Sequence, residues 1–160
     1  MTNPVWQFTN QKKLTKSEFI DYFERKVFRT IRKYDMLSKD RIIKLPKQDD
    51  LNTQVLQNIL KKKFKVELST QPNIFSQNLS QAAEDAFQNI LQGKFTGPKP
   101  DKNPLYHLSD REVELYAKLT GVSGKNRKVD KKIQSLFSRF LKKNQDLEIN
   151  IVNALSQINE

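Results

Sequence analysis

The chain has 160 residues, of which 36% are hydrophobic, and this length and composition predict a single domain, 1–160, with a modest core. It carries 29 Lys and Arg against 18 Asp and Glu, and the formal net charge of +11 favours a polyanionic partner such as nucleic acid or an acidic membrane surface. With no cysteine and one histidine, the chain is excluded from disulfide, thiolate-metal and Cys-His chemistry. No apolar stretch reaches the ~20 residues of a membrane span, and the N-terminus lacks a signal-peptide core, so we expect a cytoplasmic location and no membrane partner.

The first 14 residues, "MTNPVWQFTNQKKL", allow two interpretations. Trp6 and Phe8, with the basic pair Lys12 and Lys13, could form a flexible arm that stacks on a base. A single tryptophan near a terminus more often covers a core, however. Both interpretations stay open at the level of sequence.

Residues 15–34 predict a long helix. Thr15 and Glu18 have the spacing of a capping box, and apolar residues then recur at helical spacing from Ile20 to Tyr34. The opposite face is basic, which indicates either a phosphate-binding surface or an ordinary solvated face. Its cations are Arg25, Lys26, Arg29, Arg32 and Lys33.

The middle of the chain predicts two short strands around a helix. "RIIKL" at 41–45 and "FKVEL" at 64–68 have strand patterns, and 52–63 has helical spacing. That helix ends in Lys61, Lys62 and Lys63, which suit either the negative end of the helix dipole or a phosphate. A further helix is expected from about residue 78 to Gly93, followed by a connector at 93–104 that is rich in glycine and proline.

The last third of the chain predicts three more helices. Ser109 and Glu112 form a second capping box, and Gly121 closes the helix that follows. Residues 123–144 form a second cationic segment, in which Ile133, Leu136, Phe137 and Phe140 are expected to point inward. Its cations are Lys125, Arg127, Lys128, Lys131, Lys132, Arg139, Lys142 and Lys143. Residues 147–158 fit a strand or a helix, and we favour a helix.

No residue set predicts a metal site, a cofactor site or an acid-base pair. His107 lies between Tyr106 and Leu108, just before the second capping box, and a half-exposed structural role is expected for it. The acidic pairs Asp49-Asp50 and Glu84-Asp85 are sequence neighbours, whose side chains do not converge on one point of a helix. We therefore expect no catalytic residue, no metal and no cofactor.

Three stretches resemble one enzyme family, in the same order. "EFIDYFERKVFRTIRKYDMLSKDRII", "QNLSQAAEDAFQNIL" and "NPLYHLSDREVELYAKLTGV" are similar to segments of the archaeal and eukaryotic tRNA 2-thiouridine synthetases, members of the N-type ATP pyrophosphatase (PP-loop) superfamily. The ending "LEINIVNALSQI" is a weaker match. The resemblance covers most of residues 14–122, although the family chain is longer.

The resemblance fails where the family performs its chemistry. The family's first strand leads to a Ser-Gly-Gly-Lys-Asp-Ser loop that holds pyrophosphate; the turn here is Pro46, Lys47, Gln48, Asp49, Asp50 and Leu51. At the family's acidic motif, this chain has Asn78, Leu79, Ser80, Gln81 and Ala82. The cysteines of the zinc knuckle and of the iron-sulfur cluster have no counterparts. The resemblance therefore implies a relative that has lost its catalytic parts.

These observations lead to one fold prediction and several functional ones. We expect an α/β fold, a helix-dominated remnant of a PP-loop domain with a small parallel sheet, and an all-helical bundle is the alternative. The leading function is non-catalytic binding of structured RNA, either tRNA or ribosomal RNA. The alternatives are an accessory subunit that docks on a tRNA-modification complex, a DNA-binding helical module and a surviving ATP-using enzyme. A homodimer could cover an exposed sheet edge.

Overall fold

The computed structural model describes residues 3–95 and 98–158. Near the N-terminus, β1 (Trp6–Gln7) and β2 (Lys13–Leu14) pair as an antiparallel hairpin. Trp6 and Phe8 pack against the core, and the Trp6 ring centroid lies 5.4 Å from that of Phe19. The segment that could have been a flexible arm is therefore folded onto the domain from Val5 onward, because its aromatic rings bury apolar surface there.

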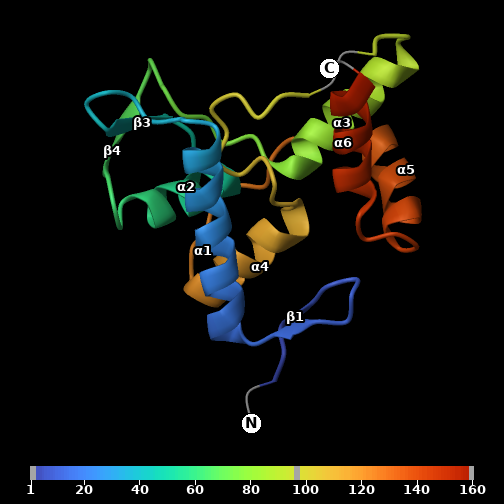
Figure 1. Cartoon of the computed structure of the whole chain (residues 1–160), viewed down its shortest axis with the longest axis horizontal. Helices are drawn as coiled ribbons and strands as arrows, with labels where there is room; N and C mark the ends of the chain where they lie inside the picture. The colour runs from blue at the N-terminus through green and yellow to red at the C-terminus, as the bar shows by residue number, and fades with distance from the viewer. Residues whose placement is uncertain (1–2, 96–97, 159–160) are drawn as a thin grey trace.

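The central helix is α1 (Lys16–Lys33), which runs through the middle of the molecule (Figure 1). The predicted capping box is present: the Glu18 backbone N-H donates to Thr15 Oγ1, and the Thr15 backbone N-H donates to Glu18 Oε1. Phe19, Phe23 and Val27 are fully buried. Because the apolar residues occupy one face, the basic residues of α1 face outward.

The parallel sheet is as small as the sequence predicted. β3 (Ile42–Pro46) is followed by α2 (Leu51–Leu60) and then by β4 (Lys65–Ser69), which pairs in parallel with β3. Among the described residues, these are the only two strands of that sheet. The helix-dominated α/β prediction is confirmed, and the all-helical alternative is wrong because the two strands form a regular ladder.

Four helices complete the chain: α3 (Leu79–Leu91), α4 (Asp110–Thr120), α5 (Lys131–Leu141) and α6 (Leu147–Ile158). The helical prediction for 147–158 is confirmed. One inward residue of the second cationic segment was predicted wrongly, because Leu136 is 36% exposed while its neighbour Phe137 is buried. The Phe140 side chain lies outside the described part of the structure.

The buried side chains form two clusters. The first cluster joins the hairpin, α1, β3, α2 and α4, and the second joins α3, α5 and α6 together with Tyr106. Figure 1 shows the three helices of the second cluster gathered on one side of the molecule and the sheet on the other. The described residues of the connector at 93–104 contain no helix or strand. No helix in the described part of the chain is both long and apolar enough to cross a membrane.

Candidate nucleic-acid interface

The exposed cations of α1 follow from the burial of its other face. Arg25, Arg29, Arg32 and Lys33 are exposed, whereas Lys26 is half-buried and donates to the Tyr22 hydroxyl at 3.1 Å. Arg25 pairs with Asp21 at 3.1 Å, but the two side chains are 72% and 59% exposed, so water screens the pair. The outer face of α1 therefore keeps most of its positive charge.

A hollow of about 400 Å³ opens beside this face. Two aromatic rings form part of its wall: Phe28 lies on α1, and Phe64 directly precedes β4. Their ring centroids are 6.2 Å apart. Arg41 and Lys63 bring two more cations to it from outside α1. We call this hollow the Phe28–Phe64 cleft; it is lined by Arg25, Phe28, Arg29, Ile31, Arg32, Leu37, Arg41, Lys63 and Phe64.

Sequence reasoning found the α1 part of this cleft and missed Arg41. Arg41 stands directly before a strand, where a single basic residue carries no periodic signal. Lys63 is one of the three lysines that end the predicted 52–63 helix, where the sequence allows either a helix-dipole role or a phosphate contact. The missing information is tertiary, since nothing in the local pattern shows that residues 41 and 63 meet α1.

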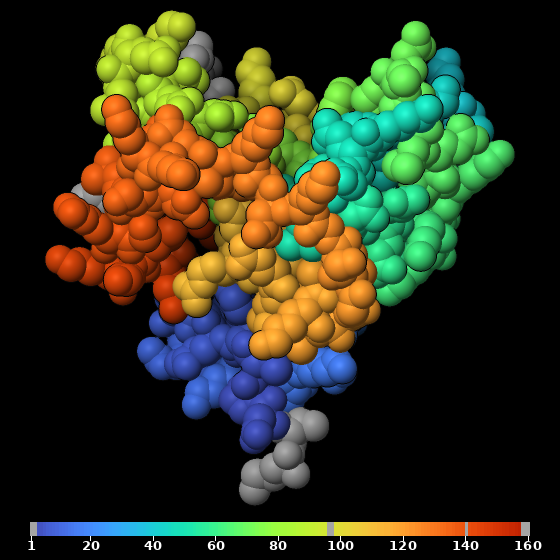
Figure 2. All heavy atoms as spheres, turned by 180° about the vertical axis from the view of Figure 1, so that it is seen from behind, coloured from blue at the N-terminus to red at the C-terminus, as the bar shows by residue number. Residues whose placement is uncertain are grey.

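The second cationic segment lies apart from the first. α5 packs in the second buried cluster at the edge of the molecule, well separated from α1 in Figure 1. Seen from behind, residues 123–139 and 141–143 lie at the surface, and several of their side chains project from it (Figure 2). Six of their predicted binding cations are exposed and make no ion pair with a described carboxylate: Lys128, Lys131, Lys132, Arg139, Lys142 and Lys143. The structure therefore presents two cationic faces and not one continuous surface.

Arg127 is not on either face. Its side chain is 10% exposed, and it holds two carboxylates at once: Nη2 lies 2.7 Å from Glu84 Oε1 and 2.6 Å from Asp110 Oδ2. The guanidinium also donates through Nη1 to Glu84 and through Nε to Asp110. Burial opposes the charge, but these hydrogen bonds and charges outweigh it and raise the pKa of Arg127. Arg127 therefore links α3 to α4. Its N-H groups already donate to these two carboxylates and are not available to a phosphate.

The turn from Pro46 to Leu51 is closed by a neighbouring segment. The Leu51 N-H donates to the Lys125 carbonyl at 2.7 Å, and the Lys125 N-H donates to the Asp49 carbonyl at 2.9 Å. Asp50 caps α2 by accepting from the Thr53 N-H and hydroxyl. Gly124 is needed at this crossing, because a Cβ there would lie 2.9 Å from Leu51 Cα. The N-H groups of the first turn that could bind a phosphate are thus largely taken.

An open hollow of about 950 Å³ nevertheless remains beside this turn, near the carboxyl ends of β3 and β4. Lys47, Gln48, Lys125 and Lys128 line it together with Asp49 and Asp50. Lys125 Nζ lies 3.1 Å from Asp49 Oδ2, but the two side chains are 79% and 71% exposed, so water screens this pair as it does the Arg25–Asp21 pair. The mixed charges of this hollow offer a phosphate much less than the cleft beside α1 does.

Residues 78–82, where the resemblance places the family's acidic motif, connect helices to one another in the structure. Asn78 caps α3 and donates to Asp110 of α4 at 2.7 Å, and the Ser80 hydroxyl accepts from the Asp110 N-H at 2.9 Å. Gln81 Oε1 accepts from the Asn78 N-H and from Asn52 of α2. Leu79 and Ala82 are buried in the second cluster. Amide and hydroxyl groups thus make structural contacts at this position, where the resemblance leads to an expectation of carboxylates.

His107 has the properties of a structural histidine. Its Nε2 lies 3.3 Å from the Tyr34 hydroxyl, and its ring stacks on the Tyr34 ring. Burial, with Lys26 and Lys33 nearby, lowers the pKa of His107 to about 4. It is therefore neutral at pH 7, and no carboxylate in the described part of the chain pairs with it.

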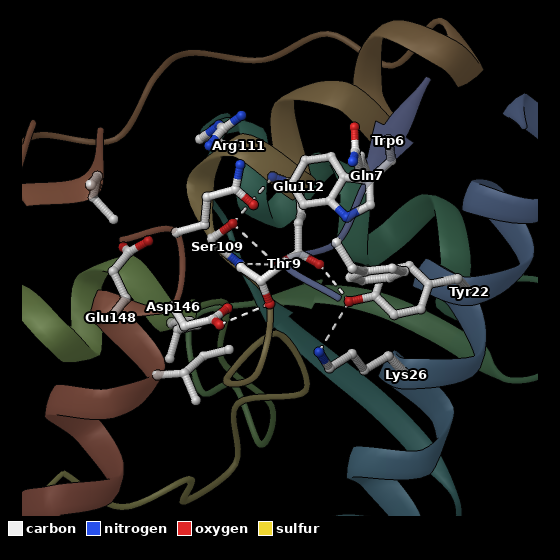
Figure 3. Close-up of a pocket in the computed structure, with 15 residues that line it drawn as sticks. Trp6, Gln7, Thr9, Tyr22, Lys26, Ser109, Arg111, Glu112, Asp146 and Glu148 are labelled. Atoms are coloured by element: carbon white, nitrogen blue, oxygen red, sulfur yellow. Dashed lines mark hydrogen bonds between the residues drawn. The ribbon is translucent and has the colours of Figure 1, made fainter. Parts of the chain in front are cut away.

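A smaller hollow, of about 160 Å³, lies between the hairpin, α1, α4 and α6 (Figure 3). Glu112 is satisfied there by the Tyr22 hydroxyl at 2.6 Å and by the N-H and hydroxyl of Ser109. The Trp6 Nε1 atom is buried and has no partner among the described residues. Burial, followed by the charges of Asp110 and Glu84, raises the pKa of Glu148 to about 7. The hollow is small, and its polar groups are mostly bonded to one another.

Comparison with known proteins gives a likeness of fold. No protein-family model and no curated protein matches the sequence. Among solved structures, the chain is similar to a U34-tRNA thiolase, NcsA from Methanococcus maripaludis with its [4Fe-4S] cluster, with a TM-score of 0.74 over 97% of this chain and 84% of that chain. The identity is 12%. This chain has no cysteine to ligate such a cluster. The fold of this protein is thus similar to that of a tRNA thiolase, on a chain that lacks the thiolate ligands of the cluster.

Proposed function

We propose that this protein binds structured RNA, either tRNA or ribosomal RNA, without catalysing a reaction on it. The observation that carries the proposal is the cationic surface around the outer face of α1. Arg29 and Arg32 of α1, with Arg41 and Lys63 beside it, make no ion pair with any described carboxylate. Unpaired arginines on an exposed face suit phosphate oxygens, which they bind through forked hydrogen bonds. The fold likeness to a tRNA thiolase makes tRNA the first RNA to test.

The contacts around the turn at 46–51 support a non-catalytic role. Lys125 and Asp50 occupy the N-H groups of Leu51 and Thr53. At the start of α3, the resemblance sets Ser80, Gln81 and Ala82 against the family's Asp-Asp-Glu. With no cysteine in the chain, no persulfide can form on it to carry sulfur. We propose that this protein keeps the scaffold of a thiolation enzyme and uses its cationic faces.

Filter binding of tRNA at about 50 mM and about 200 mM salt tests the proposal. A protein that neutralises several phosphates loses affinity steeply over this range. On a plot of log K against log salt concentration, each phosphate contact makes the slope steeper by about one unit. The matched variants are Arg29→Glu/Arg32→Glu on α1 and, as a control, Lys16→Glu/Lys118→Glu, which reverses two exposed lysines outside the cationic faces. We expect a steep salt dependence that the α1 variant reduces and the control retains.

Three outcomes would support another function. Weak tRNA binding that salt does not change would favour the accessory subunit, in which charge is secondary. Duplex DNA that displaces tRNA at equal concentration would favour a DNA-binding module. Micromolar ATP binding by calorimetry would favour a surviving nucleotide enzyme.

A further inference from the structure

The Phe28–Phe64 cleft differs from an ordinary basic patch because its wall is apolar and aromatic. Phe28 and Phe64 are both half-buried, so part of each ring is open to solvent, and Ile31 and Leu37 extend the apolar surface. The volume of about 400 Å³ lies within the range of small-ligand sites. A phosphate alone gains nothing from such a wall, whereas a flat base does.

Most cations around the cleft have no counter-charge among the described residues. Five of the nine lining residues are basic and none is acidic, and of the five only Arg25 pairs with a described carboxylate. Lys63 Nζ lies 4.3 Å from the Phe28 ring centroid, and the Arg41 guanidinium lies 5.7 Å from that of Phe64. Each ring therefore has one cation close to it. If the base of a nucleotide contacts the rings, its phosphates lie within reach of these cations.

Arg41 provides a second, independent observation. Its φ angle of +58° lies in the left-handed region, which glycine and asparagine occupy at lower cost than arginine. Strained residues of this kind concentrate at binding sites, where the side chain matters more than the backbone strain. The turn before β3 thus holds an arginine side chain against the aromatic wall in a conformation that its backbone does not favour.

We infer that the Phe28–Phe64 cleft takes one unpaired nucleotide of an RNA, with its base against the two rings and its phosphates among Arg29, Arg32 and Arg41. The inference rests on the proposed RNA-binding function and adds to it the kind of RNA that is bound. Bases inside a duplex have both faces covered, so only a base in a bulge, a loop or a single-stranded end can reach an aromatic wall. The preferred RNA is therefore one with an unstacked base.

The test compares two RNAs that differ only in this feature: a blunt duplex, and the same duplex with one bulged 2-aminopurine. Fluorescence anisotropy gives both affinities, and 2-aminopurine emission reports stacking. We expect the bulged RNA to bind about 10-fold more tightly than the duplex, with its emission quenched on binding. The variant Phe64→Leu should lose that preference and keep duplex binding.

Two further variants separate the site from folding. Arg41→Asn removes the charge and suits the left-handed backbone, so it should fold normally and weaken binding of the bulged RNA. Phe75→Leu alters a phenylalanine that is 44% exposed and lies outside the cleft, and it should bind both RNAs as the parent protein does. Circular dichroism checks that each variant is folded.

The outcomes are distinct. Equal binding of both RNAs, unchanged by Phe64→Leu, would overturn the inference and leave the RNA-binding function standing. Failure to bind either RNA or tRNA would overturn the proposed function itself. If adenosine 5′-monophosphate binds the cleft as tightly as the bulged RNA does, the site is one for free nucleotides. Binding to phosphatidylserine vesicles that depends on Phe64 would make it a membrane contact, and either result would contradict the inference.

Discussion

At the scale of single residues, Arg127 shows why charge in a sequence is an incomplete guide to a binding surface. It follows a basic loop and precedes a basic helix, so its pattern is that of a phosphate-binding residue. In the structure its side chain is 10% exposed and pairs with Glu84 and Asp110. The two carboxylates are 43 and 17 residues away in the chain, so no local pattern links them to Arg127.

The variant Arg127→Met tests this structural role. It leaves Glu84, which is 14% exposed, without a counter-charge, and Asp110, which is one-third exposed, only partly solvated. We expect the free energy of unfolding to fall by about 3 kcal/mol in urea titrations. tRNA affinity should not change while the protein is folded. If tRNA binding is weakened and stability is unchanged, Arg127 is a binding residue after all.

Glu148 predicts a pH dependence of stability. Its folded pKa of about 7 exceeds the ordinary 4.5, so between these values the folded protein holds a proton that the unfolded chain releases. Its stabilising contribution is thus complete below pH 4.5 and is lost as the pH rises through 7. Urea titrations should show Glu148→Gln to be more stable than the parent at pH 8 and equal to it at pH 4. The lowered pKa of His107 makes stability rise with pH instead, but this contribution is the same in the parent protein and in Glu148→Gln and does not affect the comparison.

At the scale of elements, the helices were predictable and their contacts were not. Capping boxes and apolar periodicity placed α1 and α4, because these signals lie within one turn of the element that they specify, whereas the pattern at 147–158 fitted a strand as well as the helix α6. The closing of the turn at 46–51 by Lys125 could not be read from the sequence, since about 75 residues separate the two segments and the link runs through backbone groups. Likewise, the α1 half of the cleft was predictable and the Arg41 contribution was not.

The crossing at Gly124 can be tested by adding one methyl group. Gly124→Ala puts a Cβ 2.9 Å from the Leu51 backbone, which must move, and the overpacking should cost about 1–3 kcal/mol in chemical denaturation. As a comparison, Asp50→Ala should cost about 1 kcal/mol through loss of the α2 cap, and Asp50→Asn should cost little. All three should bind tRNA as the parent protein does. A large loss of affinity in Asp50→Asn alone would show that the turn is a working site.

At the scale of the whole molecule, the two cationic faces lie on separate buried clusters, so they should act independently. Charge reversal at Arg29 and Arg32 on α1, and at Arg139 and Lys142 on the second segment, should weaken tRNA binding by amounts that add in the combined variant to within about 0.5 kcal/mol. Filter binding at fixed salt measures the three affinities. If a bound RNA uses only one of the two faces, one variant should bind as the parent protein does, and the combined variant should lose no more affinity than the other variant.

The hairpin that buries Trp6 gives this protein its own optical probe. The chain has a single tryptophan, and it packs against the first buried cluster next to Phe19, so its emission reports chiefly on that cluster. Circular dichroism reports all the helices. Because Arg127 ties α3 to α4, the two signals should change together in urea for the parent protein. In Arg127→Met they should separate, with helix content falling before tryptophan emission shifts; coincident curves in the variant would mean that apolar packing alone makes the two clusters unfold as one.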